Sequence, residues 1–190
     1  MRHLHRDRVA LASAAAALLL GLSAAAAGEA FKLRSPTVAP DGTLANDQVY
    51  DGFGCSGRNI SPALTWSGAP AGTKSFALTV YDPDAPTGSG WWHWVVYDIP
   101  ASVTELAEGA GDAGGSLPAS AKQGRTDFGT AGYGGPCPPA GDKPHHYVFT
   151  LYALKVATID VPAGSSAAWI GFTIRASRLA SSSFTALYGR

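Results

Sequence analysis

The stretch that decides the fold reads SFALTVYDPDAPTGSGWWHWVVYDIP, from Ser75 to Pro100. It contains two runs rich in β-branched and aromatic residues, Ser75–Asp82 and Trp92–Ile99, and the segment between them is rich in Pro, Gly and Asp. Apolar and aromatic runs of this length, bounded by turn-forming residues, are typical of β-strands. The stretch therefore predicts two strands separated by a turn.

The rest of the chain adds elements of the same kind and one helix. Ser165 or Ser166 is a suitable N-cap for a helix over Ala167–Leu179. The glycine-rich stretch 101–131 shows no sustained period, so we expect a functional or partly ordered excursion there. Further strands are expected at Ala63–Trp66, Tyr147–Leu154 and, as a short closing strand, Ser183–Tyr188.

The composition agrees with one β-rich domain. The chain has 190 residues, of which 46% are apolar and only 15% are charged, with 23 Gly and 13 Pro. These values exclude a fibrous repeat, a long disordered tail and several independent domains. Fourteen basic and fourteen acidic residues cancel, so no strong field attracts nucleic acid, and we expect no nucleic-acid partner.

The N-terminal segment has the pattern of an export signal. Three Arg precede Val9–Ala27, a run of nineteen uncharged residues that ends in small residues of A-x-A type. This pattern predicts a secretory signal peptide over 1–27, with a single mature domain over 28–190 in the periplasm or outside the cell. The alternative is a membrane anchor, since about 20 apolar residues can cross a bilayer. We expect no membrane span within 28–190.

The mature domain would hold two cysteines, Cys55 and Cys137. An oxidising compartment permits them to pair, and the alternative is two unrelated buried thiols. The sequence has no CxxC pair and no histidine at close ligand spacing, which argues against zinc.

The candidates for chemistry are histidines beside predicted strands. Period-two alternation places His93 with Trp91 and Val95 on one face of its strand, and His145 with Tyr147 on one face of another. Asp82 ends a third strand. A carboxylate, two imidazoles and a phenol at strand ends would form a site that hydrogen-bonds a phosphate or carboxylate.

Each of these residues also has a purely structural interpretation. A histidine at a strand end is often only hydrogen-bonded in place, and Asp82 before Pro83 is a good turn starter. The tryptophans are most simply core. GxSxG, P-loop and HExxH motifs are absent from the sequence.

Two long blocks, DPDAPTGSGWWHWVVYDIP (82–100) and GPCPPAGDKPHHYVFTLYAL (135–154), resemble the signatures of the phosphatidylethanolamine-binding protein family, closest to its bacterial Raf-kinase-inhibitor-like branch. The flanking pieces NISPALTW (59–66), TDFGTAGYGG (126–135) and GFTIRASRLASSSFTALYG (171–189) agree with it. The resemblance covers most of 45–190.

The resemblance implies a mainly β Greek-key fold with two antiparallel sheets, a C-terminal helix and a small pocket for phosphate-like anions. It also implies a disulfide between Cys55 and Cys137 near that pocket. It implies no cofactor. Two departures leave the headgroup preference open: the 87–90 loop is short, and His146 replaces the usual arginine. The implied ligand-binding residues are Asp82, Trp91, His93, Gly135, Pro138, His145 and Tyr147.

Three functions follow as hypotheses. The preferred one is an exported protein that binds a phosphate monoester or phospholipid headgroup and is not an enzyme. The second is a hydrolase or a metal-dependent enzyme that uses Asp82, His93 and His145 as acid and base or as a two-histidine, one-carboxylate site. The third is a protease- or kinase-inhibitor-like protein with an unknown protein partner.

Overall fold

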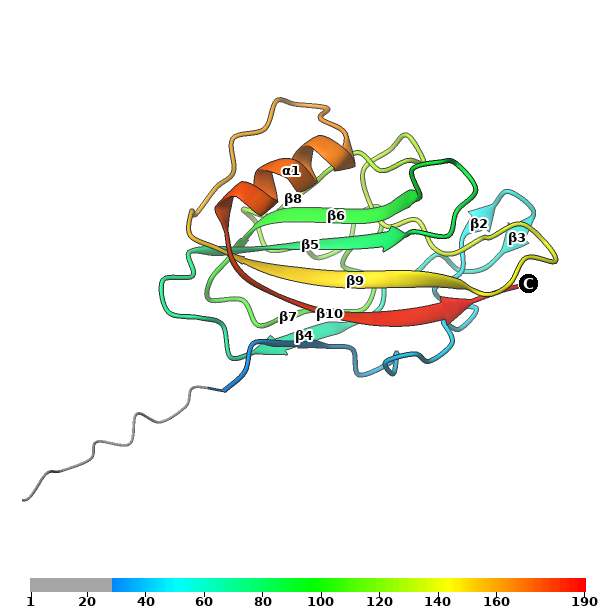
Figure 1. Cartoon of the computed structure of the whole chain (residues 1–190), viewed down its shortest axis with the longest axis horizontal. Helices are drawn as coiled ribbons and strands as arrows, with labels where there is room; N and C mark the ends of the chain where they lie inside the picture. Colours follow the sequence, from blue (N-terminus) through cyan, green and yellow to red (C-terminus); the bar gives the residue numbers. More distant parts are fainter. Residues whose placement is uncertain (1–28) are drawn as a thin grey trace, which may run out of the picture.

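The computed structural model describes residues 29–190, so the predicted signal peptide lies outside the described residues. The strands and the helix follow one another along the chain as Figure 1 shows. Their bounds are β1 (Lys32–Arg34), β2 (Asp51–Gly52), β3 (Cys55–Ser56), β4 (Leu64–Ser67), β5 (Ser75–Asp82), β6 (Trp91–Pro100), β7 (Glu105–Leu106), β8 (Lys122–Gln123), β9 (His145–Leu154), α1 (Ala167–Ser177) and β10 (Arg178–Tyr188).

The strands form antiparallel sheets, which confirms the mainly β fold with one C-terminal helix. The larger sheet has the order β10-β9-β5-β6-β8, and a three-stranded sheet has the order β1-β4-β7. The expectation of two sheets is incomplete, because β2 and β3 pair as a separate small hairpin. The stretch 101–131 contributes β7 and β8 to the two larger sheets and winds through turns elsewhere.

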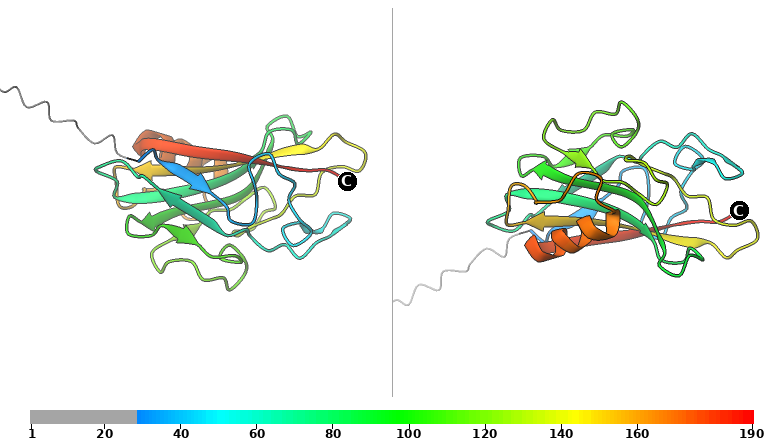
Figure 2. Two further views of the ribbon diagram at one scale, coloured as in Figure 1. Left: turned by 90° about the horizontal axis from the view of Figure 1, so that it is seen from below. Right: turned by 90° about the horizontal axis from the view of Figure 1, so that it is seen from above.

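Two apolar clusters hold three layers together. One cluster fills the space between the two larger sheets and includes Leu33, Trp66 and Phe76. The other lies between α1 and the opposite face of the five-stranded sheet and includes Val95 and Ile170. The two edge-on views of Figure 2 show the helix packed across that outer face. Because β5 is covered on both sides, its sequence is apolar along most of its length rather than alternating.

The boundary between the helix and the closing strand lies at a different position from the one that the sequence predicted. The helix begins at Ala167, after the expected cap Ser166, whose side chain accepts the backbone N–H of Trp169. It ends at Ser177 because Arg178 adopts an extended conformation. The closing strand therefore starts at Arg178 rather than Ser183, and it is long rather than short, with a register irregularity near its start.

Strand β6 contains a bulge at the histidine that the sequence singled out. Val80 pairs with Trp94 and Tyr81 pairs with Trp92, so His93 is an extra residue on its strand. A bulge of this kind shifts the period-two alternation by one residue, so each side chain beyond it points to the face opposite to the predicted one. The predicted grouping of His93 with Val95 is therefore wrong: Val95 packs in the helix-facing cluster beside Trp92.

Among residues 29–190, no helix has the length and apolar character needed to cross a membrane.

Candidate anion-binding site

Three neighbouring strands bring the candidate residues to one edge of the five-stranded sheet. Strand β5 ends at Asp82, while β6 begins at Trp91 and β9 begins at His145. Because β5 lies between the other two and runs antiparallel to both, these three ends meet, and Asp82 is the register partner of Trp91. The sequence correctly predicted this convergence.

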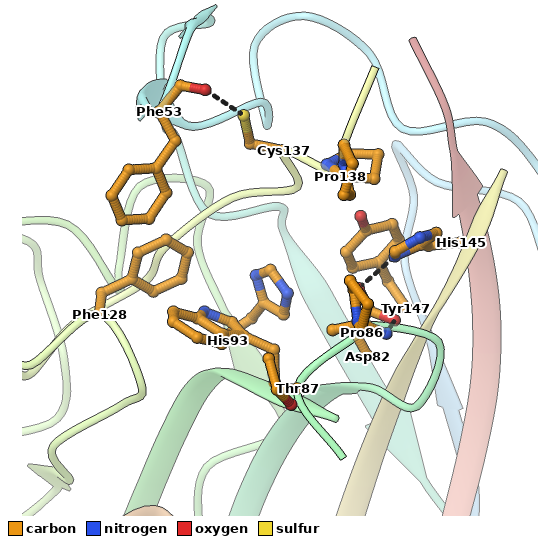
Figure 3. Close-up of a pocket in the computed structure, with 13 residues that line it drawn as sticks. Phe53, Asp82, Pro86, Thr87, His93, Phe128, Cys137, Pro138, His145 and Tyr147 are labelled. Atoms are coloured by element: carbon orange, nitrogen blue, oxygen red, sulfur yellow. Dashed lines mark hydrogen bonds and ion pairs between the residues drawn. The ribbon is translucent and has the colours of Figure 1, made fainter. Parts of the chain in front are cut away.

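A cavity of about 150 Å³ opens at this edge (Figure 3). Six of the seven predicted residues line it. The complete lining is Phe53, Asp82, Ala85, Pro86, Thr87, Trp91, His93, Phe128, Cys137, Pro138, Pro139, His145 and Tyr147.

The predicted residue Gly135 is not among the lining residues. Its N–H donates to Oδ1 of Asn59 at 2.7 Å, and a Cβ at this position would overlap the carbonyl oxygen of Gln48. Gly135 therefore lets the chain that leads to Pro138 pass close against the 48–50 backbone. Gly135 thus helps to position the wall of the cavity.

Asp82 has both of its carboxylate oxygens engaged. Oδ1 accepts the backbone N–H groups of Asp84 and Ala85 at 2.8 and 3.1 Å, which begins the turn after β5. Oδ2 accepts Nδ1–H of His145 at 2.7 Å, and both side chains are buried. The structural interpretation of Asp82 therefore applies, and the same carboxylate also orients an imidazole that lines the cavity.

His145 and Tyr147 both line the cavity, as alternation along β9 predicted. His146 between them points away and is exposed. Its backbone N–H and its Nδ1 both lie 2.7 Å from Oδ2 of Asp84, on the turn that follows β5. This contact fastens the 83–90 loop, which contributes Pro86 and Thr87 to the lining, against β9.

His93 is held by the loop opposite the sheet. Its Nδ1 lies 2.7 Å from the carbonyl oxygen of Gly134. Its ring meets the rings of Tyr147 and Phe128 edge-on, with centroids 5.1 and 5.5 Å away. Burial lowers the pKa of His93 and outweighs the opposing effects of the Gly134 carbonyl and Asp82. Burial therefore favours the neutral form of the imidazole.

Three buried polar atoms of lining residues lack a hydrogen-bond partner within the protein: Nε1 of Trp91, Nε2 of His93 and the hydroxyl of Tyr147. Among the described residues only Nε1 of Trp66, in the core, shares this condition. In Figure 3 the Tyr147 hydroxyl points toward Pro138, and the His93 ring lies between Phe128 and Tyr147. Burial, reinforced by Asp82, raises the pKa of the Tyr147 phenol. The hydroxyl therefore stays protonated and can donate a hydrogen bond. Buried polar groups are rarely left unpaired, so these three atoms are available to hydrogen-bond a small polar molecule in the cavity.

The mouth of the cavity is aromatic, which sequence reasoning missed. Phe128 contacts Trp91 edge-on at 5.4 Å and stacks on Phe53 at 5.9 Å, and Phe53 is 68% exposed. Neither phenylalanine belongs to a strand, so strand periodicity had no means of finding it. The only sequence signal was that Phe128 falls within TDFGTAGYGG.

Two links hold the walls of this mouth. A disulfide joins Cys55 to Cys137, whose Cα atoms are 6.0 Å apart, and ties the β2–β3 hairpin to the turn that carries Pro138. The guanidinium of Arg190 donates to the carbonyl oxygens of Pro138 and Gly54 at 2.7 and 2.9 Å. The implied disulfide is thus present, and Cys137 itself lines the cavity.

The enzymatic hypotheses need either a metal site or a free nucleophile at the cavity. Within residues 29–190, no group of three or more His, Cys, Asp and Glu side chains is placed to hold a metal ion. The lining has no serine, its cysteine is in the disulfide, and the Thr87 hydroxyl donates to the Gly90 carbonyl at 2.6 Å.

Comparisons with known proteins agree with this fold. The family model described as phosphatidylethanolamine-binding protein matches residues 34–189. The YbcL protein of Escherichia coli strain K12 is 52% identical over 172 residues, which cover 90% of this chain and 94% of YbcL. The LppC protein of Mycobacterium tuberculosis strain H37Rv, described as a lipoprotein, is 38% identical over 181 residues, covering 84% of this chain and 85% of LppC.

Solved structures give the same result. The crystal structure of E. coli YbcL, described as a member of the mammalian PEBP family, superposes with a TM-score of 0.82 at 54% identity, covering 84% of this chain and 98% of YbcL. That of the Chlamydia trachomatis homologue CT736 gives 0.71 at 30% identity, covering 85% of this chain and 98% of CT736. With its sequence match over 34–189 and this shared fold, the chain belongs to the phosphatidylethanolamine-binding protein family.

Proposed function

We propose that the protein is exported and binds a small phosphate-like anion, such as a phosphate monoester or a phospholipid headgroup, in the cavity at the edge of the five-stranded sheet. The observation that carries this proposal is the set of unpartnered buried polar atoms at the cavity, on Trp91, His93 and Tyr147. The indole N–H and the phenol O–H are donors, and an oxyanion supplies the acceptors that they lack.

The shape of the site supports a ligand with one polar end and one apolar end. About 150 Å³ accommodates a group of phosphate size, and the aromatic side chains of Phe53 and Phe128 lie beside it. Ligand sites commonly combine a mostly apolar lining with a few placed polar groups.

The same lining favours binding over catalysis. Asp82 and His145 form a buried carboxylate–imidazole pair of the kind that activates a nucleophile, but the cavity offers no free serine or cysteine for them to activate. We therefore assign the pair to positioning and to hydrogen bonding rather than to hydrolysis.

Export is supported by two features of the chain. The 1–27 segment has the pattern of a cleavable signal. The Cys55–Cys137 disulfide is of a type that persists outside the reducing cytosol. The family member LppC, described as a lipoprotein, fits the same location. Expression of the full sequence followed by intact-mass measurement tests this, with a mature chain that begins at Gly28 as the expected product.

The binding proposal is tested by NMR titration of the protein purified after expression of its full sequence. Inorganic phosphate and phosphoethanolamine should shift the imidazole signals of His93 and His145. The signal of His146, which faces away from the cavity, serves as the internal control and should move less. Unchanged His93 and His145 signals at millimolar phosphate and phosphoethanolamine would contradict the proposal.

Modulation of a protein partner is a further part of this proposal, since one branch of the family that the sequence resembles is named for kinase inhibition. The exposed Phe53, which lines the cavity, would give such a partner an apolar contact next to the bound anion. Affinity capture from envelope extracts with and without saturating phosphate tests it. A partner of this kind should be retained in one of the two conditions only.

A further inference from the structure

The hydrogen-bond network around His93 fixes which of its nitrogens carries the proton. The Gly134 carbonyl oxygen, 2.7 Å from Nδ1, can only accept, so Nδ1 must donate. In a neutral imidazole the other nitrogen, Nε2, then bears a lone pair and accepts. Nε2 is buried without a protein partner, and the residue as a whole is 4% exposed. The cavity thus presents one acceptor beside the donors of Trp91 and Tyr147.

The charged groups around His93 do not force a proton onto Nε2. Asp82 approaches from β5, but its oxygens already accept two backbone N–H groups and the His145 imidazole. Asp127, on the 126–135 segment, is exposed and accepts the backbone N–H of Trp92. From β9 the neighbours are His145 and the protonated phenol of Tyr147. Burial keeps the pKa of His93 below its ordinary value despite these groups.

We propose that the cavity selects an oxyanion that brings one acidic proton with it, a phosphomonoester or hydrogen phosphate, over an anion without one, such as sulfate. In the complex a P–O–H group donates to Nε2 of His93, while the other phosphoryl oxygens accept from Tyr147 and Trp91. This inference rests on the proposed anion-binding function and specifies its ligand class.

Proton accounting gives the measurable consequence. A phosphomonoester is mostly a dianion above its second pKa of about 6. Every phosphoryl oxygen of the dianion carries only lone pairs, and one of them would face the lone pair of Nε2. The complex therefore needs one proton between these two atoms, bound either to the ligand oxygen or to Nε2. Binding above pH 7 therefore takes up about one proton, and the affinity falls about tenfold for each pH unit. Sulfate brings no proton at any pH between 5 and 9, so its binding depends on the protonation of a buried imidazole.

The test is calorimetric titration of the protein with methyl phosphate and with inorganic sulfate at pH 6 to 8.5, in two buffers of different ionisation enthalpy. We expect an uptake of about one proton per methyl phosphate at pH 8, and sulfate binding at least tenfold weaker than methyl phosphate at pH 7.5. Methyl phosphate binding without proton uptake, or equal affinity for sulfate, overturns this inference and leaves anion binding intact. Failure of both anions to bind at any pH overturns anion binding itself, and this inference with it.

Two further measurements address His93 directly. Nitrogen-15 NMR of the wild-type protein should show an unprotonated Nε2 whose signal moves when methyl phosphate is added, and a protonated Nε2 before addition would contradict the inference. In His93→Gln the side-chain amide can donate to the anion, so proton uptake should disappear and the preference for methyl phosphate over sulfate should shrink. The NMR spectrum of the variant shows whether it is folded. Proton uptake that persists in a folded His93→Gln protein would mean that the proton binds at a group other than His93.

Discussion

Replacement of Tyr147 by Phe removes one oxygen atom from the cavity and should change stability and binding in opposite directions. The hydroxyl is buried and has no partner within the protein, a condition that costs about 1–3 kcal/mol. Removal of the hydroxyl therefore raises the free energy of unfolding of the ligand-free protein by up to that amount. For a domain of this size, each kcal/mol corresponds to about 2–4 °C in Tm.

The same change removes a donor from the proposed anion site. A hydrogen bond to a charged group contributes about 1.5–3 kcal/mol, which corresponds to a loss of about 10- to 150-fold in affinity. The variant should thus melt at a higher temperature than the wild type while its affinity for methyl phosphate is much weaker.

Tyr133→Phe is the matched control. The Tyr133 hydroxyl is also on a buried residue, but it donates to the Gln48 carbonyl at 3.1 Å, and Tyr133 does not line the cavity. Its loss should lower stability by about 1 kcal/mol and leave methyl phosphate affinity unchanged. The assays are thermal denaturation without ligand and calorimetric titration at pH 6.5. A destabilised Tyr147→Phe protein with wild-type affinity would refute the assignment of this hydroxyl to a ligand.

Three further predictions concern stability. The double change Cys55→Ser and Cys137→Ser opens a crosslink that spans 82 positions and should lower the free energy of unfolding by about 4 kcal/mol, measured in urea; a loss below 1 kcal/mol would contradict the loop-closure argument. Ser166→Ala removes the N-cap of α1 and should cost about 1 kcal/mol by thermal denaturation, whereas an unchanged Tm would show the cap to be idle. Partial burial raises the pKa of Asp84, but the backbone N–H and imidazole of His146 outweigh it and hold the pKa below its ordinary value. The stabilising contact is therefore complete at neutral pH and is lost as the pH falls from about 4 through the lowered pKa, which the His146 amide signal should report in the wild type and not in Asp84→Asn.

The sequence predicted the strands that build the site because their signals are local. The run Ser75–Asp82 carries apolar side chains between turn residues, and its observed bounds agree with the prediction. The start of β10 was not predictable in this way. Arg178 to Ser183 are mostly exposed on an edge strand, and they adopt strand geometry because β9 offers hydrogen bonds, not because of their own preferences.

The site shows the same limit. Alternation correctly placed His145 and Tyr147 on one face, because β9 pairs regularly with β10 there. It failed beyond His93, since a bulge depends on the partner strand and leaves no mark in a period-two pattern. Phe53 and Phe128 reach the cavity from loops that only tertiary packing and the disulfide bring together.

The Cys55–Cys137 link makes the rim of the cavity depend on the redox conditions under which the chain folds. Molecules that fold where thiols stay reduced should form the same strands, but no covalent bond would join the hairpin that carries Phe53 to the turn that carries Pro138. Preparations from a reducing cytoplasm should accordingly contain folded molecules with a loosened aromatic rim, and their ligand affinities should rise after oxidation in the test tube. Under the proposed export, the covalent link across the rim would therefore form only after the chain has left the reducing cytosol.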